Sequence, residues 1–150
     1  MDAVVRPCTR EDLPAVGKLL AELSEVARGQ ALPDLARREV LLAEMEAEPG
    51  TYLNLVAERE GRVVGFLSLV FYRTFFHEGG TALINELVVR RDLRRAGIGR
   101  ALVDRAQAEA KARGMDELEV GTERTNEPAL AFYRKAGFEQ EYVLLGMEFE

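Results

Sequence analysis

Apolar positions recur along the chain at two different spacings, and these spacings predict its helices and strands. The first stripe at helical spacing comprises Val16, Leu19, Leu20 and Leu23. Pro14 fits only the first turn of this helix, so Asp12 is the better N-cap and Thr9 its rival. The segment Arg28-Gly29-Gln30 interrupts the spacing and ends the helix.

A second helix and a group of strands follow. The helix is predicted from about Pro33 to a stop before Pro49, with inward side chains at Leu35, Leu41, Leu42 and Met45. Strands are expected at Ala3–Val5, Tyr52–Glu58, Val63–Phe71 and Ala82–Val89. The segment Arg59-Glu60-Gly61-Arg62 is a good hairpin connection, because Gly61 can supply a positive φ.

The last third of the chain alternates between helices and strands. Its predicted elements are a helix over Gly97–Arg113, a strand over Glu117–Gly121, a helix from Asn126 to Lys135, and two strands between Phe138 and Phe149 that turn at Gly146. This order predicts one α/β domain over residues 1–150, with helices on the faces of a sheet.

The composition argues against several classes of protein. A net charge of −6 disfavours nucleic-acid and membrane-surface partners, because phosphate binding needs a basic face. The single cysteine, Cys8, fits a reducing cytosol. Neither a secretion signal nor an apolar stretch long enough for a membrane span is evident. We therefore expect a cytoplasmic protein.

The stretch from Leu87 to Leu102 carries the candidate chemistry. It contains an apolar strand, a basic loop, two glycines spaced by one residue, and an amphipathic helix. The arginines of the basic loop and the helix start are Arg90, Arg91, Arg94, Arg95 and Arg100. A helix N-terminus offers unpaired N–H groups, and Gly97 and Gly99 let a diphosphate approach the backbone. Together these features predict an anion cradle.

Three interpretations of this stretch compete on its residues alone. A Walker loop requires Gly-Lys-Ser/Thr, which is absent. A dinucleotide fingerprint requires a third small residue where Leu102 stands, so Gly97 and Gly99 support it weakly. Glycines that only ease a tight turn from strand to helix remain the third interpretation.

Two motifs in order resemble the hallmarks of the GNAT acetyltransferase superfamily. Arg94-x-x-Gly97-x-Gly99, directly after an apolar strand, is similar to the acyl-CoA pyrophosphate motif of that superfamily. Downstream, Asn126, Tyr133 and Gly137-Phe138 resemble its second motif. The order of elements matches along almost the whole chain, least distinctively over the first two helices.

The resemblance implies a GNAT-like fold, with a mixed, twisted central sheet of about six to seven strands flanked by about four helices. Acetyl-CoA, the implied donor, would lie in a V-shaped gap between the strands near Val89 and Val120, and no metal is implied. Its pantetheine arm would run along the backbone, and Asn126 would cap a helix, contact this arm, or both. The implied cofactor-binding residues are Leu87, Val88, Val89, Arg94, Arg95, Ala96, Gly97, Ile98, Gly99, Arg100, Asn126 and Tyr133.

Direct acetyl transfer to an amine requires a group that accepts the amine proton. Glu86 is the first candidate, because it interrupts an otherwise apolar strand where a carboxylate is costly to bury. An edge-facing carboxylate paired with an arginine is the alternative reading. Asn85 can orient a water, and His77 and Glu78 are the next candidates on the preceding loop.

The reaction also requires an oxyanion site and a proton for the departing thiolate. The resemblance implies that Tyr133 supplies that proton; a purely structural core tyrosine is the alternative. The backbone N–H groups of Val88 and Val89 are the expected oxyanion site. We expect Arg90 and Arg91 to matter less to the phosphates than Arg94, Arg95 and Arg100.

These residues favour an N-acetyltransferase that acts on a primary amine. The acidic charge suits a small cationic acceptor, such as a polyamine or an aminoglycoside-like molecule, or a lysine side chain. One alternative is acetylation of protein N-termini or of a ribosomal protein, with the loop Ser24–Leu32 and the C-terminal strands as the acceptor wall. Another is a catalytically silent acyl-CoA-binding regulatory module. The apolar run Tyr142–Leu145 is either a buried strand or a homodimer contact.

Overall fold

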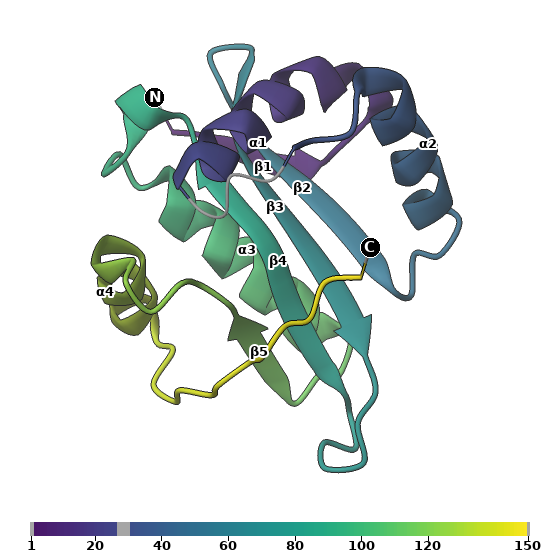
Figure 1. Ribbon diagram of the computed structural model, residues 1–150, viewed down its shortest axis with the longest axis vertical. Helices are drawn as coiled ribbons and strands as arrows, with labels where there is room; N and C mark the ends of the chain where they lie inside the picture. The colour runs from purple at the N-terminus through teal and green to yellow at the C-terminus, as the bar shows by residue number, and fades with distance from the viewer. Residues whose placement is uncertain (1, 27–30, 150) are drawn as a thin grey trace.

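Figure 1 shows the computed structural model of the chain, which describes residues 2–26 and 31–149. The predicted helix break at Arg28-Gly29-Gln30, and with it part of the Ser24–Leu32 loop, lies outside the described residues. The elements in chain order are β1 (Val4–Pro7), the 3-10 turn η1 (Arg10–Asp12), α1 (Leu13–Val26), α2 (Leu35–Glu46), β2 (Tyr52–Arg59), β3 (Arg62–Tyr72), β4 (Thr81–Val89), the 3-10 turn η2 (Arg91–Leu93), α3 (Ile98–Ala112), β5 (Glu117–Val120) and α4 (Glu127–Ala136). Within the described ranges, no helix combines the length and the apolar character that crossing a bilayer requires.

The strands of the described chain form one mixed sheet in the order β1-β2-β3-β4-β5. Neighbours from β1 to β4 are antiparallel, whereas β5 is parallel to β4. The β2–β3 hairpin turns at Glu60 and Gly61, whose φ angles of 53° and 77° belong to a type I′ turn. The predicted α/β class is therefore confirmed, with fewer strands than the six or seven that were expected.

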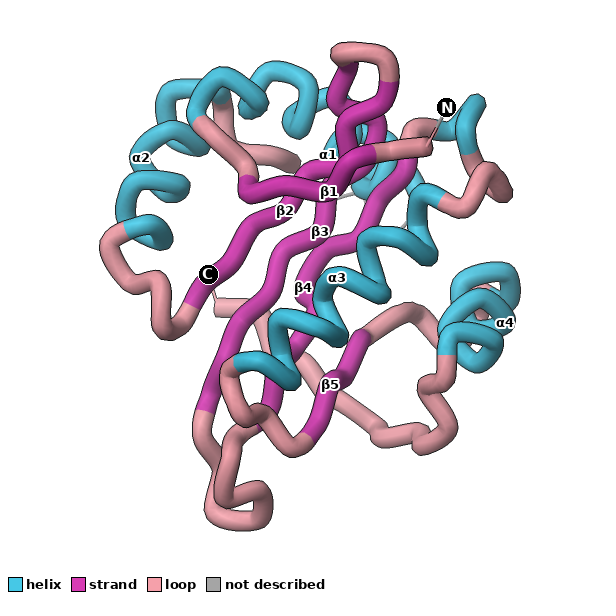
Figure 2. The backbone as a smooth tube through the Cα atoms, turned by 180° about the vertical axis from the view of Figure 1, so that it is seen from behind, coloured by secondary structure: helices cyan, strands magenta, loops and turns pink. Residues whose placement is uncertain are grey.

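Helices cover both faces of the sheet (Figure 2). On one face α3 packs over a core that includes Leu67, Ile84 and Leu102, each almost fully buried. On the other face α1 and α2 pack over a second core that includes Val16 and Phe66. Because β4 contacts both α3 and α1, its backbone is held rigidly between the two layers.

The start of the first helical segment differs from the predicted one. Thr9, not Asp12, is the N-cap, and the chain passes through η1 before α1 begins at Leu13. The Asp12 carboxylate instead accepts hydrogen bonds from the Thr9 N–H (2.8 Å) and from the Arg6 guanidinium (2.8 and 2.9 Å). This pairing holds Asp12 at the third position of the turn, so the better N-cap named from the sequence is wrong and its rival is correct.

The second helix buries less of its apolar stripe than the sequence predicts. Leu42 is buried, and Leu41 and Met45 are half-buried, but Leu35 is 39% exposed. α2 lies at the rim of the fold against α1 and β2 (Figure 1), and Leu35 belongs to its first turn. A helix at the rim offers only a narrow face to the core, which explains the wrong assignment of Leu35.

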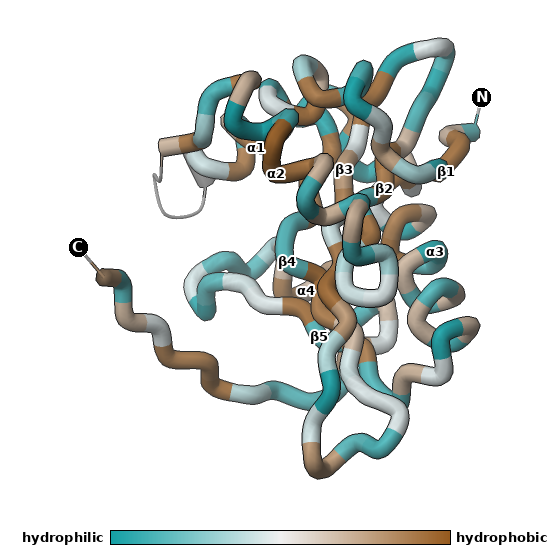
Figure 3. The backbone as a smooth tube through the Cα atoms, turned by 90° about the vertical axis from the view of Figure 1, so that its right-hand side faces the viewer, coloured by the Kyte–Doolittle hydropathy of each residue, from teal (hydrophilic) through white to brown (hydrophobic). Residues whose placement is uncertain are grey.

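The two predicted final strands are absent: residues 138–149 contain no regular secondary structure. We call this segment the C-terminal arm. Figures 1 and 3 show that it crosses the α1/α2 side of the sheet and then extends away from the body of the molecule. A strand requires a partner backbone, and the arm crosses β5 and β4 instead of running along an edge. The prediction of two strands turning at Gly146 is therefore wrong for this chain on its own.

The pairing of Arg6 with Asp12 generates a prediction about stability. The Arg6 hydrogen bonds are the main cause that lowers the pKa of Asp12, so this carboxylate stabilises the fold above its unfolded pKa. This contribution is lost as the pH falls below about 4. We expect Asp12→Asn to lower the free energy of unfolding by about 2 kcal/mol at pH 7, with the difference shrinking below pH 4. Urea unfolding at several pH values measures it, and a constant difference across that range would contradict the assignment.

Candidate active site

The site begins where β5 separates from β4. The two strands pair only from Thr81↔Glu117 to Ile84↔Val120, so the following residues of β4 have no neighbour on that side. In the register between β3 and β4, Ser68 pairs with Glu86 but Leu69 pairs with Ile84, which makes Asn85 the extra residue of a β-bulge. A bulge bends its strand and re-aims the side chains beside it. The bulge therefore coincides with the point at which the sheet opens.

Hydrogen bonding along β4 alternates between its two sides. The Arg90 N–H donates to the Val64 carbonyl on β3 (2.8 Å), and the antiparallel register places Val88 in the same relation to β3. Leu87 and Val89 therefore direct their N–H and carbonyl groups to the open edge. Of the two N–H groups expected to form the oxyanion site, that of Val89 faces this edge and that of Val88 faces β3; the N–H of Leu87 also faces the edge.

The loop after β4 leads into α3 through two left-handed residues. Arg95 has φ 68°, and Gly97, the N-cap of α3, has φ 84° with open space where a Cβ would stand. The first bond of the helix runs from the Ala101 N–H to the Gly97 carbonyl (3.1 Å), so the N–H groups of residues 98–100 precede it. These donors and the positive end of the helix dipole point out of the helix start. The segment has the geometry of an anion cradle.

The two positions of the motif require glycine for different physical reasons. Gly97 needs its left-handed backbone and leaves room in front of the helix. A Cβ on Gly99 would stand 3.3 Å from the Phe132 ring of α4, closer than most real contacts. Gly99 therefore lets α4 approach the start of α3. This packing against α4 is a reason for Gly99 that neither the tight-turn interpretation nor the anion-cradle interpretation contained.

The arginines of this region differ in how they are already paired. Arg90 donates two hydrogen bonds to Asp92 (2.7 and 3.1 Å), and Arg100 donates to Asp104 one turn along α3 (2.9 Å). Arg94 and Arg95 are exposed and make no ion pair within the described part of the chain. The side chains with the greatest freedom to meet an anion at the helix start are those of Arg94 and Arg95.

Glu86 lies next to the bulge and is held by a serine. Ser68 Oγ donates to Glu86 Oε1 (2.7 Å) and accepts from the Glu86 N–H (3.0 Å). Ser68 is only 6% exposed, whereas Glu86 is half-buried and keeps contact with solvent. The predicted alternative, a carboxylate paired with an arginine, is not what the structure shows. Asn85, in the bulge, is exposed, and Glu86 keeps a fixed carboxylate at the mouth of the opening.

Tyr133 lies on α4 within an aromatic cluster. Its ring makes edge contacts with Phe132 (centroids 5.5 Å apart) and Phe138 (5.7 Å). Burial raises the pKa of its phenol to about 12, so the hydroxyl keeps its proton at any physiological pH. Asn126 caps α4, since its Oδ1 accepts from the Ala129 N–H (3.3 Å), as the sequence predicts.

Sequence reasoning missed an acidic surface beside Glu86. Side chains of paired strands alternate between faces, so Glu117 and Glu119 on β5 share the face of Ser68 and Glu86. Tyr72 donates to Glu119, and His77 Nε2 lies 3.4 Å from Glu117 Oε1. His77 is thus engaged with an acid and not with Glu86. The available signal was the pair of acidic residues alternating with Leu118 and Val120 in a short strand.

Two hollows of the described residues lie beside other elements than the open edge of β4. One, of about 330 Å³, lies beside the β2–β3 hairpin and is lined by Arg59, Arg62, Arg90 and other residues. The other, of about 220 Å³, lies between α2 and β2 near Cys8. The described residues contain no cluster of His, Cys, Asp or Glu arranged to hold a metal ion.

Comparison with known proteins bears on this geometry. The model of the acetyltransferase (GNAT) family matches residues 16–138. Aminoalkylphosphonate N-acetyltransferase of Salmonella typhimurium is 31% identical over 138 residues, which is 92% of this chain and 86% of that protein. Two longer acetyltransferase relatives match over 94 and 97 residues, and the chain spans only 41% and 29% of their length.

Solved structures share the whole fold. A transcriptional regulator from Bacillus halodurans superposes with a TM-score of 0.83 at 26% identity, covering 98% of this chain and 99% of that one. An aminoglycoside acetyltransferase from an uncultured soil metagenomic sample has a TM-score of 0.77 at 26% identity, with both chains fully covered. The open sheet and its flanking helices are therefore an arrangement found in experimental structures.

The described residues fit the donor that the family implies, acetyl-CoA. There is open space in front of Gly97, and the side chains of Arg94 and Arg95 beside it are exposed. Leu87 and Val89 present backbone groups along the open edge of β4 that leads to it. A diphosphate requires such donors and positive charge, and an extended amide-bearing chain requires such an edge.

The arginine pairing generates the second prediction. We expect Arg95→Ala to weaken acetyl-CoA binding about 10-fold, because a free cation near the helix start is lost. Arg90→Ala should change it less than twofold, because Asp92 already engages that side chain. Calorimetric titration measures both variants, with dephospho-CoA and NAD as control ligands. A larger loss for Arg90→Ala than for Arg95→Ala would contradict the assignment.

Proposed function

Because the chain belongs to the acetyltransferase (GNAT) family, we propose that it transfers an acetyl group from acetyl-CoA directly to a primary amine. The observation that carries this proposal is the open edge of β4, which has Glu86 at its bulge and ends in the cradle at Gly97. When bound, acetyl-CoA supplies the acetyl group as a thioester. The remaining steps are assigned to side chains and backbone groups of the chain.

The donor would be held by backbone groups first. Leu87 and Val89 present N–H and carbonyl groups that can pair with an extended pantetheine arm. One of these N–H groups would stabilise the negative charge that develops on the carbonyl oxygen. The N–H groups of residues 98–100, with Arg94 and Arg95, would hold the pyrophosphate.

Glu86 is the proposed base. A lysine-like ammonium has a pKa near 10.4, so removing its proton at pH 7 costs about 4.6 kcal/mol. A carboxylate fixed at 2.7 Å by the Ser68 hydroxyl can receive that proton, directly or through a water. The amine nitrogen then forms its bond to the acetyl carbon as the carbon–sulfur bond breaks. Ser68 would keep the carboxylate aimed at the opening.

Tyr133 is the proposed partner of the leaving sulfur. Tyr133 is half-buried and its phenol has a pKa of about 12, so complete transfer of its proton to a thiolate near 8.5 is uphill by about 5 kcal/mol. For a phenol with the ordinary pKa near 10, the same transfer would cost only about 2 kcal/mol. Burial therefore favours Tyr133 as a hydrogen-bond donor to the sulfur, while the full proton transfer is completed as the thiol equilibrates with solvent.

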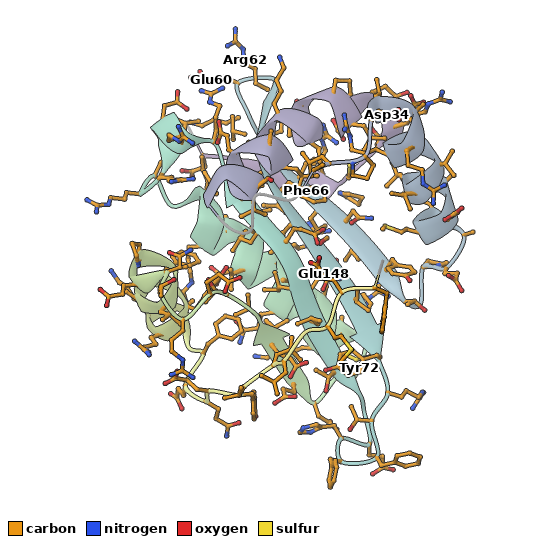
Figure 4. All side chains as sticks on the ribbon, in the orientation of Figure 1. Asp34, Glu60, Arg62, Phe66, Tyr72 and Glu148 are labelled. Atoms are coloured by element: carbon orange, nitrogen blue, oxygen red, sulfur yellow. The ribbon has the colours of Figure 1, made fainter. Side chains whose placement is uncertain are left out.

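The acceptor is proposed to be a small cationic amine, such as a polyamine or an aminoglycoside-like molecule. Glu86, Glu117 and Glu119 lie on one face of the sheet by strand register. Figure 4 labels two β3 side chains of this face, Phe66 in the core beneath α1 and Tyr72 farther along the strand. Carboxylates at the mouth of a cleft attract cations and stabilise the positive charge of further amino groups. The similar proteins named for aminoalkylphosphonate and aminoglycoside acetylation support an amine of low molecular mass.

The proposed roles of Glu86 and Tyr133 are tested by turnover. Glu86→Gln keeps an oxygen for the Ser68 hydroxyl but cannot take a proton, so we expect kcat to fall by about 10²- to 10³-fold. Tyr133→Phe should lower kcat by about 10- to 100-fold. Both should leave the acetyl-CoA Kd within about twofold, and Tyr52→Phe, in β2, is the matched control. Because Tyr133 has a pKa of about 12, wild-type kcat should show no loss from its ionisation below pH 10.

The same experiment distinguishes an enzyme from a catalytically silent acyl-CoA-binding regulatory module. The similarity with a transcriptional regulator supports the second of these hypotheses. Donor binding without turnover on a panel of polyamines, aminoglycosides and peptide amines would favour the silent module. Turnover that survives both substitutions at the wild-type rate would overturn the roles given to Glu86 and Tyr133.

The acidic surface generates a prediction about the acceptor. Glu119→Gln retains the Tyr72 hydrogen bond but removes one charge, so we expect the KM for a cationic acceptor to rise about 5- to 10-fold at low salt. The KM for acetyl-CoA should not change. Glu44→Gln, an exposed site on α2, is the control for net charge. Equal acceptor KM values in all three proteins would rule out this surface as the acceptor wall.

A further inference from the structure

We infer that the hollow between the β2–β3 hairpin and η2 is a second anion site, which takes a small molecule carrying a phosphate group. The hollow has a volume of about 330 Å³ and is lined by Arg59, Glu60, Arg62, Val64, Arg90 and Leu93. This volume lies at the lower end of the range for small-molecule sites. The inference goes beyond the proposed function and does not depend on it.

Strand register collects three arginines around the hollow. Arg59 and Arg62 are direct partners across the hairpin, and Figure 4 labels Arg62 beside the turn residue Glu60. The Arg90 N–H donates to the Val64 carbonyl (2.8 Å), which brings the end of β4 to the same place. Like charges directly opposite each other destabilise a strand pair, and a bound anion would relieve that repulsion.

The arginines keep donors that the rest of the described chain does not use. The side chains of Arg59 and Arg62 form no hydrogen bond or ion pair with the residues that the structure describes. Arg90 donates to Asp92 through Nε and Nη2, so its Nη1 remains for another acceptor. Against the three arginines the lining contains one carboxylate, that of Glu60. The excess of positive charge favours an anionic ligand.

The number of guanidinium groups favours phosphate over carboxylate. A guanidinium presents its N–H groups as a planar fork that matches two oxygens of either anion. A carboxylate has two oxygens, which one fork can occupy, whereas a phosphate monoester has three terminal oxygens for several forks. Val64 is buried and Leu93 is half-buried, so the lining also offers apolar contacts to the organic part of a monoester.

The hollow is separate from the proposed donor cradle. It lies on the β3 side of β4, where Arg90 pairs with Val64, whereas the proposed donor edge of β4 faces the β5 side. Neither Arg94 nor Arg95 of the cradle is among its lining residues. A phosphate bound in the hollow is therefore not the pyrophosphate of the donor.

The first test is an NMR titration of the isotope-labelled wild-type protein with inorganic phosphate and with glycerol phosphate, at matched ionic strength in sodium chloride. We expect saturable shifts of the amide signals of residues 59–64 and 93, with tighter binding of the ester. Amides 98–100 report separately on any phosphate at the donor cradle. Acetate is the carboxylate control and should not saturate the signals of the hollow. Shifts that follow ionic strength alone, or acetate binding as tight as that of phosphate, overturn the inference.

The second test compares variants in the same titration. Arg59→Gln and Arg62→Gln each remove one guanidinium from an exposed hairpin and should weaken phosphate binding at the hollow about 10-fold. Arg37→Gln makes the same change at an exposed position of α2 and should bind phosphate like the wild type. Wild-type affinity in both hairpin variants, or an equal loss in Arg37→Gln, contradicts the assignment.

The third test separates the hollow from the donor site. Saturating acetyl-CoA should leave the phosphate affinity of the hollow within about twofold, because the two sites share no residue. Displacement of phosphate by acetyl-CoA would make the hollow a part of the donor site and overturn the inference. A protein that binds phosphate at the hollow but binds no acetyl-CoA would contradict the proposed function and leave this inference intact.

Discussion

The separation of β5 from β4 after the Ile84↔Val120 pair is the constraint on which the site depends. If the pairing continued, the backbone groups of Leu87 and Val89 would form hydrogen bonds with β5. Their N–H and carbonyl groups would then be unavailable to a ligand. The bulge at Asn85 lies at the same point of β4, on the side that pairs with β3. Its one extra residue bends β4 where the pairing with β5 ends. The opening is a consequence of strand geometry and not of a missing side chain.

That constraint also orders the chemical groups around β4. Beyond the bulge, side chains alternate, so Glu86 faces the α1/α2 side while Leu87 faces α3. The Glu86 carboxylate is therefore next to the acidic surface, and the edge of the strand, between the two faces, is left for an extended ligand. Two layers of packed helices hold β4 in place, which preserves these directions. Ser68 fixes the carboxylate itself.

Local patterns in the sequence predicted most of the fold. The helix after Gly97, the cap at Asn126 and the hairpin at Gly61 follow from short-range rules, and each is confirmed. The N-cap of the first helical segment, which begins with η1, was misassigned because the Arg6 contact with Asp12 is tertiary and leaves no trace in the local pattern. The final strands were predicted from the apolar residues between Phe138 and Phe149, which indicate side chains suited to a buried strand. Such a pattern does not indicate whether another strand is available to pair with this backbone.

The site was predictable in its parts but not in its arrangement. Gly97 and Glu86 stand out in the sequence, since a glycine before a helix and a carboxylate in an apolar strand both break local rules at a cost. Ser68 and Glu119 do not stand out, because their importance comes from register across β3, β4 and β5. The pKa of Tyr133 also depends on burial, which only packing decides.

Charge is distributed so that a net value of −6 conceals two opposed regions. Exposed Arg94 and Arg95 lie at the start of α3, while Glu117 and Glu119 lie on the α1/α2 face of the sheet. An anionic ligand and a cationic ligand would therefore approach β4 from different directions and be kept from each other's sites by like-charge repulsion. Their reactive ends would meet only at the edge of β4 beside Glu86. A surface of a single sign would attract one of the two proposed ligands and repel the other, whereas the opposed regions suit an anionic donor and a cationic acceptor at one strand.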